Sequence, residues 1–225
     1  MSKNKCFFVL FFFLWSFLPT DILRSFFRCK FCPSGYFGAE SGKSRCAICE
    51  TGQYQSTMDS KFCYDCPSGR YGSEEGLKCA QFCAHECKAC VAGLFMTEEG
   101  AISGENCENC PVGRFSEIDG RSHVAHCKKC RPGYYNGLEA QAVESACLPC
   151  ALGRYADEFG MSSATSGCKA CPIGRYGDEV GNGIIDRCKL CAPGLVGITP
   201  GLNKSNDCTD CIAGRYSTFS GISDP

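Results

Sequence analysis

Ten CxxC cysteine pairs recur along this chain of 225 residues. The first cysteines of the first three pairs lie 17 residues apart, and from Cys87 onward the interval is 20 residues, once 21. A regular period of this length is typical of tandem structural repeats. In chain order the pairs are Cys29/Cys32, Cys46/Cys49, Cys63/Cys66, Cys87/Cys90, Cys107/Cys110, Cys127/Cys130, Cys147/Cys150, Cys168/Cys171, Cys188/Cys191 and Cys208/Cys211.

Each repeat carries further residues at regular places after its second cysteine. A glycine follows three residues later in all ten repeats, which predicts a turn with positive φ or a close backbone approach. Two residues further on comes an aromatic residue, with Val196 as the single exception. We expect these rings to lie over the disulfides. A second glycine usually follows the aromatic by five residues, but Asp59 and Ala140 stand in its place in two repeats.

A repeat of about 20 residues buries too little surface to fold without covalent cross-links. A disulfide that closes a loop of about 15 residues contributes roughly 3 kcal/mol in the chain-entropy model. Helix signals are nearly absent, and aromatic residues flanked by polar ones indicate short hairpins. The predicted fold class is therefore small and disulfide-rich: an elongated tandem array of short β-hairpin and loop units, with little helix outside the N-terminal segment.

The N-terminus has the order of charged and apolar residues that is typical of a secretory signal. Lys3 and Lys5 precede an apolar run from Cys6 to Leu18, shorter than the roughly 20 residues of a membrane helix. We predict a signal peptide over residues 1–24, cleaved between Thr20 and Ser25, with an uncleaved signal-anchor as the alternative. Cleavage removes one of the 23 cysteines, and the remaining 22 suit an oxidising compartment. The predicted location is secreted or cell surface.

The spacing breaks between the two series of repeats, in the string CAQFCAHECKAC that adds Cys79 and Cys83. We call this string, residues 79–90, the seam. We therefore predict one domain over residues 25–83, with the 17-residue period, and a second over residues 84–225, with the 20-residue period. The last repeat stops in mid-unit, which predicts a truncated chain, a fragment or an open last unit. Membrane attachment would then come from the signal-anchor or from a missing C-terminal segment.

We predict that all 22 cysteines outside the signal segment are structural disulfide cysteines. Two connectivities fit the spacing, and the sequence does not choose between them. In the first, the second cysteine of each pair bonds to the first cysteine of the next, as in Cys32–Cys46. This leaves Cys29 and Cys211 over and requires a special arrangement at the seam. In the second, neighbouring pairs bond first to first and second to second. The ten pairs and Cys79/Cys83 make eleven clusters, which cannot all be matched in twos.

The strings CPSGRYGSEEGLKC, CENCPVGRF, CLPCALGRYADEFG and CKACPIGRYGDEVG resemble the ephrin-receptor-like cysteine-rich repeat, which is similar in style to EGF-like and tumour-necrosis-factor-receptor modules. The resemblance extends over nearly all of the chain from Cys29 to Pro225. It implies an elongated, non-catalytic ectodomain that serves as a structural spacer or as a protein-interaction or adhesion module. The sequence contains neither the ligand-binding domain nor the kinase domain of an ephrin receptor, and a fold does not transfer function.

Two alternatives assign chemistry to the CxxC pairs. Successive pairs have the spacing of zinc sites built from four cysteines, so a zinc-binding repeat protein is the main alternative. An exposed CxxC pair can also serve a thiol oxidoreductase, although ten copies embedded in one structural unit argue against a single poised active site. The secretory signal favours disulfides over both.

Other candidate residues are few. His123 and His126 could share a metal if helical, and HECKA from His85 lacks the second histidine of a metalloprotease. Carboxylate pairs recur at Glu74/Glu75, Glu98/Glu99, Asp157/Glu158 and Asp178/Glu179 without the spacing of a calcium loop. We therefore predict no catalytic residues, no cofactor and no metal.

The last sequence features concern partners and modification. Asn203 begins the glycosylation sequon NKS. The near-neutral charge gives no support for nucleic-acid binding, so the expected partner is an unknown protein or glycan. An arginine separates glycine and aromatic in five repeats, where we expect it to stack on neighbouring rings, with a basic stripe as the alternative. These are Arg70, Arg114, Arg154, Arg175 and Arg215.

Overall fold

The computed structural model describes residues 29–224, which divide into two compact units. Within the described residues the first unit runs to Lys88 and includes Glu98–Gly104, and the second comprises Ala89–Thr97 and the chain from Glu105 onward. The predicted signal peptide lies outside the described residues, and the boundary between residues 83 and 84 stays a prediction. In the part of the chain that is described, no helix is long and apolar enough to cross a membrane.

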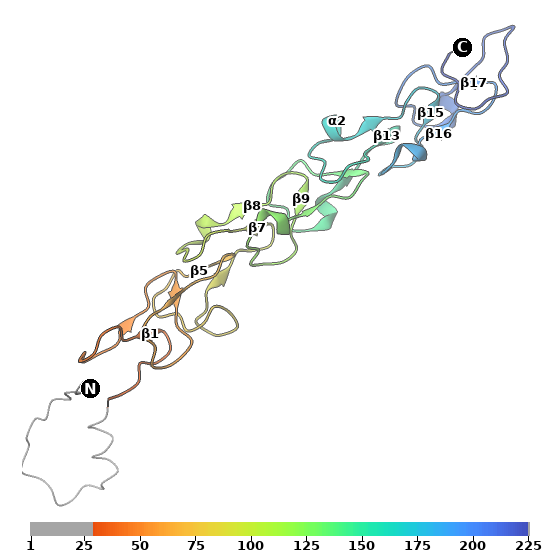
Figure 1. Cartoon of the computed structure of the whole chain (residues 1–225). Helices are drawn as coiled ribbons and strands as arrows, with labels where there is room; N and C mark the ends of the chain where they lie inside the picture. Colours follow the sequence, from red (N-terminus) through yellow and green to blue (C-terminus); the bar gives the residue numbers. More distant parts are fainter. Residues whose placement is uncertain (1–28, 225) are drawn as a thin grey trace, which may run out of the picture. The chain divides into compact units, whose positions relative to one another are not determined.

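The first unit is built from two-residue strands joined by turns (Figure 1). β1 pairs with β2, and β3 with β4, each in antiparallel register. The strands up to the boundary of this unit are β1 (Tyr36–Phe37), β2 (Ala47–Ile48), β3 (Gln53–Tyr54), β4 (Tyr64–Asp65), β5 (Arg70–Tyr71) and β6 (Lys88–Ala89).

The second unit repeats the same hairpin, with β7 paired to β8 and so on in chain order to β17 with β18. Its strands are β7 (Leu94–Phe95), β8 (Glu108–Asn109), β9 (Arg114–Phe115), β10 (Lys128–Lys129), β11 (Tyr134–Tyr135), β12 (Leu148–Pro149), β13 (Arg154–Tyr155), β14 (Lys169–Ala170), β15 (Arg175–Tyr176), β16 (Lys189–Leu190), β17 (Leu195–Val196) and β18 (Thr209–Asp210).

Within residues 29–224, helix is confined to single turns in the loops that precede the first cysteine of a pair. These are the 3-10 turns η1 (Gly104–Asn106), η2 (Val124–His126), η3 (Glu144–Ala146), η4 (Ile185–Arg187) and η5 (Ser205–Asp207), and the short α2 (Ala164–Gly167). The prediction of a small disulfide-rich array of short hairpins with almost no helix is therefore confirmed in the described residues.

Each hairpin is closed by a disulfide that follows the first of the two predicted connectivities. Cys110 bonds to Cys127, for example, and the strands β9 and β10 lie beside this bond. Nine of the ten disulfides within residues 29–224 join the second cysteine of one pair to the first of the next: Cys32–Cys46, Cys49–Cys63, Cys66–Cys87, Cys90–Cys107, Cys110–Cys127, Cys130–Cys147, Cys150–Cys168, Cys171–Cys188 and Cys191–Cys208. The tenth, Cys79–Cys83, lies inside the loop that Cys66–Cys87 closes.

The core consists of small clusters in which an aromatic ring of one repeat packs on the disulfide of the next. Phe95 lies on Cys110–Cys127, and Phe115 on Cys130–Cys147. Tyr155 lies in the same way on Cys171–Cys188. Each cluster therefore joins two successive repeats, and the expectation that the rings cover the disulfides is confirmed for these three.

The first glycine of a repeat has positive φ and lies against the backbone two repeats further on. A Cβ at Gly133, whose φ is 87°, would overlap the carbonyl oxygen of Gly181. The same contact recurs for Gly113 with Gly160 and for Gly153 with Gly201. Both reasons for a glycine that the sequence predicted, positive φ and close approach, apply at this place.

The second turn keeps its backbone conformation even where glycine is replaced. Asp59 has a φ of 61° and Ala140 a φ of 56° in the places that glycine fills in the other repeats. The amide of Ala140 donates to Cys110 O over 2.9 Å, as that of Gly160 does to Cys130 O over 2.8 Å. This hydrogen bond holds the turn in the left-handed region at the cost of about 1 kcal/mol for a residue with a Cβ.

We predict that Gly133→Ala destabilises the protein much more than Gly214→Ala. Both glycines have a φ of 87°, so both substitutions cost about 1 kcal/mol of backbone strain. A methyl group at Gly214 meets no heavy atom within 4 Å, whereas at Gly133 it meets the Gly181 carbonyl and adds about 2 kcal/mol. Urea denaturation of the two variants measures the difference, and equal losses would contradict the close-contact role.

Candidate functional site

The recurring side chains of the repeat are the first place to look for chemistry, because they occur at the same place in many units. Four of the five arginines use their guanidinium to hold a backbone carbonyl. Nη1 donates to the oxygen of the first cysteine of the next pair over 2.8 Å for Arg70 and Cys87, 3.0 Å for Arg114 and Cys127, 2.7 Å for Arg154 and Cys168, and 2.8 Å for Arg175 and Cys188.

The expectation that these four arginines stack on rings is therefore wrong. Over the described residues, the cation–π contacts are those of Lys128 over Phe115, at 5.8 Å from the ring centre, and of Arg131 over Tyr134, at 4.2 Å. The hairpin brings the carbonyl of the next cysteine to the guanidinium. The guanidinium has five fixed N–H donors, and a carbonyl oxygen is a better hydrogen-bond acceptor for them than a ring face.

A second recurring contact is an ion pair across the hairpin, which sequence reasoning missed. Lys128 pairs with Glu117 at 3.0 Å, Lys169 with Asp157 at 2.6 Å and Lys189 with Asp178 at 2.8 Å. The signal is in the sequence: the lysine directly follows the first cysteine of a pair, and the carboxylate lies two residues after the aromatic of the preceding repeat.

These pairs explain several of the acidic residues weighed as calcium ligands. The Lys189 ammonium donates a hydrogen bond to Asp178 and holds the pKa of that carboxyl below its usual value. Lys169 lowers the pKa of Asp157 in the same way. Glu74 lies 3.4 Å from Lys88. Among residues 29–224, no group of three His, Cys, Asp or Glu side chains is placed to hold a metal ion.

The histidines take part in local contacts. His123 caps η2, because its Nδ1 accepts from the amide of Ala125 over 3.0 Å. The Nδ1 of His126 lies 3.4 Å from Ser122 Oγ. The helical arrangement that would let His123 and His126 share a metal is thus replaced by a single 3-10 turn with His123 at its start.

Disulfide bonding also bears on the zinc and oxidoreductase alternatives. In each CxxC pair from Cys32 to Cys208, the bonded cysteines have partners in different pairs rather than within one CxxC. A sulfur in a disulfide is not a thiolate and cannot ligate zinc, and a redox CxxC pair forms its bond within the motif. The observed pairing supports neither alternative.

Two of the predicted disulfide cysteines need separate mention. Cys211 is half-buried and has no disulfide partner among the described residues, and its pairing stays a prediction. In the bonding pattern of the described residues, the second cysteine of a pair bonds to the first cysteine of the next pair. Cys29 is the first described residue and is exposed, and its pairing stays a prediction.

Asn203, the predicted glycosylation residue, is exposed at a turn before η5. In the orientation that satisfies its hydrogen bonds, its side-chain amide nitrogen donates to Leu152 O over 3.1 Å and to Gly201 O over 3.2 Å. Its backbone amide donates to Asp207. The residue thus also joins its loop to an earlier repeat, and its glycosylation stays a prediction.

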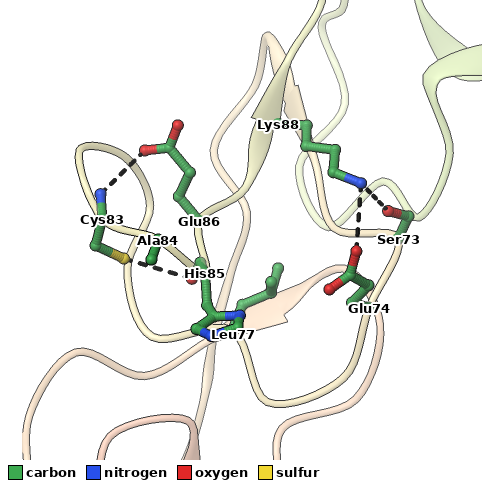
Figure 2. A pocket seen from close by; sticks show the side chains of 8 residues that line it. All are labelled: Ser73, Glu74, Leu77, Cys83, Ala84, His85, Glu86 and Lys88. Carbon is green, nitrogen blue, oxygen red and sulfur yellow. Dashed lines mark hydrogen bonds and ion pairs between the residues drawn. The ribbon is translucent and has the colours of Figure 1, made fainter.

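A pocket of about 250 Å³ lies in the first unit at the seam (Figure 2). Cys83, His85 and Glu86 lie on one side of it, and Glu74 and Lys88 on the other. The Cys83 amide donates to Glu86 over 3.3 Å, while Lys88 donates to Ser73 and Glu74. Two extra cysteines interrupt the series of CxxC pairs here, and one of them, Cys83, is exposed although it is disulfide-bonded.

The repeat structure can now be compared with known proteins. Residues 35–83 match the family model described as tyrosine-protein kinase ephrin type A/B receptor-like. The resemblance to the ephrin-receptor-like repeat is thereby confirmed for these residues, and its extension over the rest of the chain stays a prediction. The matched span runs from the first glycine of the first repeat through the hairpins β1–β2 and β3–β4 to Cys83. None of the curated proteins matches the chain. An ephrin-receptor-like domain with many disulfides is a receptor-type module and is consistent with an extracellular location.

We expect Arg114→Met to destabilise the protein by about 1.5 kcal/mol, because it leaves the carbonyl of the buried Cys127 without its charged donor. Lys128→Met in the partner strand is the matched control, since it removes only exposed contacts that contribute little, the ion pair with Glu117 and the cation–π contact with Phe115. Thermal unfolding of both variants measures the contrast. An unchanged midpoint for Arg114→Met would contradict the anchoring role.

The ion pairs predict how stability depends on pH. Because the folded pKa of Asp178 lies below the unfolded one, the pair contributes stability that is fully present above the unfolded pKa and is lost as pH falls through the folded pKa. Titration of the Asp178 carboxyl by NMR should give a lower midpoint in the natural chain than in Lys189→Met. Lys129→Met, which removes a charge from another hairpin, should leave the midpoint unchanged.

Proposed function

We propose that this chain is a non-catalytic extracellular module that acts as a structural spacer in a secreted or cell-surface protein. The observation that carries the proposal is the series of disulfides that links each CxxC pair to the next. Such bonds persist in the oxidising compartments outside the cytosol. The match of residues 35–83 to a receptor-type module supports the same location.

The spacer role is supported by what the recurring side chains do. The cysteines, the aromatics, the first glycines and the arginines all contact the next repeat or the one after it. A module whose repeated residues hold its neighbours can be lengthened by adding repeats without a change in its local structure. The remaining exposed residues are available for other roles.

A second candidate, interaction with a protein or glycan, is favoured by apolar side chains in the loops between the aromatic and the second turn. One such exposed residue occurs in each of six successive repeats: Ile118, Leu138, Phe159, Val180, Ile198 and Phe219. Exposed apolar side chains of this size are the kind that binding surfaces use when they form one patch. Among the strand tyrosines, Tyr36 is exposed, whereas Tyr134 is half-buried and lies beneath Arg131.

The test is to express the full chain in eukaryotic cells, recover it from the medium and measure its intact mass after alkylation, before and after reduction. We expect few alkylated cysteines before reduction, twenty more after it, and no zinc in the protein. A chain without residues 1–24 is the control and should stay inside the cell.

Two results would overturn the proposal. Retention of the full chain in the cytosol would contradict the extracellular location. Alkylation of most cysteines without reduction, together with stoichiometric zinc, would replace the disulfide module with a zinc-binding repeat protein.

Treatment of the secreted protein with an N-glycosidase, compared with Asn203→Gln, shows in the same spectra whether Asn203 carries a glycan.

A further inference from the structure

The disulfide Cys79–Cys83 differs from the other nine in its exposure. Each of the others within residues 29–224 has at least one buried cysteine, and most have two. In this bond Cys79 is half-buried and Cys83 is exposed. Since thiol–disulfide exchange requires access to a sulfur atom, this is the bond of the series that an external thiol can reach most readily.

The bond is also the one that the repeat framework needs least. It joins cysteines only four residues apart, and it lies inside the larger loop closed by Cys66–Cys87. The ends of its loop are held by backbone hydrogen bonds as well, from Lys78 N to His85 O over 2.8 Å and from Cys87 N to Cys79 O over 3.2 Å. Opening Cys79–Cys83 therefore leaves the larger loop and its disulfide Cys66–Cys87 in place.

The surroundings suit the reduced form. Cys79 Sγ lies 3.1 Å from Gln81 O, and Cys83 Sγ lies 3.4 Å from His85 O. A disulfide sulfur has no proton to donate, but a thiol has one, so each cysteine would find an acceptor after reduction. Phe82, between them, is 89% exposed and has a φ of 68°, a strained conformation that an opened loop could release.

The seam pocket provides space for a small thiol beside Cys83. Its lining is mostly polar and includes the Lys88 ammonium and the Glu74 and Glu86 carboxylates, with His85 next to the reactive sulfur (Figure 2). The ammonium group of a peptide-like thiol such as glutathione can pair with the Glu86 or Glu74 carboxylate, while Lys88 is hydrogen-bonded to Ser73 and Glu74. Both the exposed sulfur and the space for an attacking group thus occur at one place.

We propose that Cys79–Cys83 is a site of reversible exchange with a small external thiol. The thiolate attacks Cys83 Sγ, the bond to Cys79 breaks, and Cys79 leaves as a thiolate that takes a proton from water. The product is a mixed disulfide at Cys83. Cys79 can attack it and restore the original bond, or a second thiol can release the adduct as its own disulfide, which completes a two-electron reduction.

This inference rests on the proposed disulfide module, and the experiment separates the two. The secreted full chain is first shown by intact mass to contain its disulfides, and a failure at this step contradicts the module as well. The oxidised protein is then treated with limiting reduced glutathione, quenched with acid, alkylated and mapped by peptide mass spectrometry. The buried bond Cys110–Cys127 is the internal reference.

We expect opening of Cys79–Cys83 to be at least about ten times faster than that of Cys110–Cys127, with a glutathione adduct on Cys83. The variant Cys79→Ser/Cys83→Ser should lose the adduct and keep the unfolding midpoint of the other repeats. Opening of both bonds at equal rates, or adducts spread over other cysteines while Cys83 carries none, would overturn the proposal and leave the module intact.

Discussion

The disulfide between the second cysteine of one pair and the first cysteine of the next is the interaction on which the rest of the structure depends. The strands that it encloses are only two residues long, and an isolated hairpin is marginally stable at best in water. The bond holds the two strands together and also provides the apolar surface on which the aromatic ring of the preceding repeat packs. Without this bond, the two-residue hairpin is not stable and the aromatic ring has no disulfide to pack on.

Contacts within each unit reach beyond the adjacent repeat. The aromatic ring contacts the next disulfide, whereas the first glycine contacts a turn two repeats further on. Stability in such an array is a sum of neighbour terms, and a repeat with a missing neighbour loses part of it. Tyr155 illustrates such a neighbour contact, because it is 8% exposed where it packs on the disulfide Cys171–Cys188.

At the seam, two additional cysteines interrupt the regular series of CxxC pairs. Cys66 passes over two intervening cysteines to bond with Cys87, so the regular series continues, and the extra residues form a loop with its own small disulfide. The regular bonds are largely buried because rings and turns cover them, and the extra bond lies where no repeat contact covers Cys83. The disulfide Cys79–Cys83, which the repeat framework does not need, is therefore the one that an external thiol can reach most readily.

The sequence by itself determined the disulfide-rich class, the hairpin repeat, the glycine turns and the packing of aromatics on cysteines, because these follow from spacing and from local steric limits. Only the tertiary structure decided the rest. Both connectivities fit the spacing, and the choice depends on which cysteines a two-residue hairpin brings together. Arg114 lies beside an aromatic in sequence, which suggested stacking, but its carbonyl partner is 13 residues away. Asp59 and Ala140 keep the turn without glycine because backbone hydrogen bonds from other repeats compensate the strain. Contacts between residues far apart in the chain leave no local signal, and these are the contacts that tertiary structure supplies.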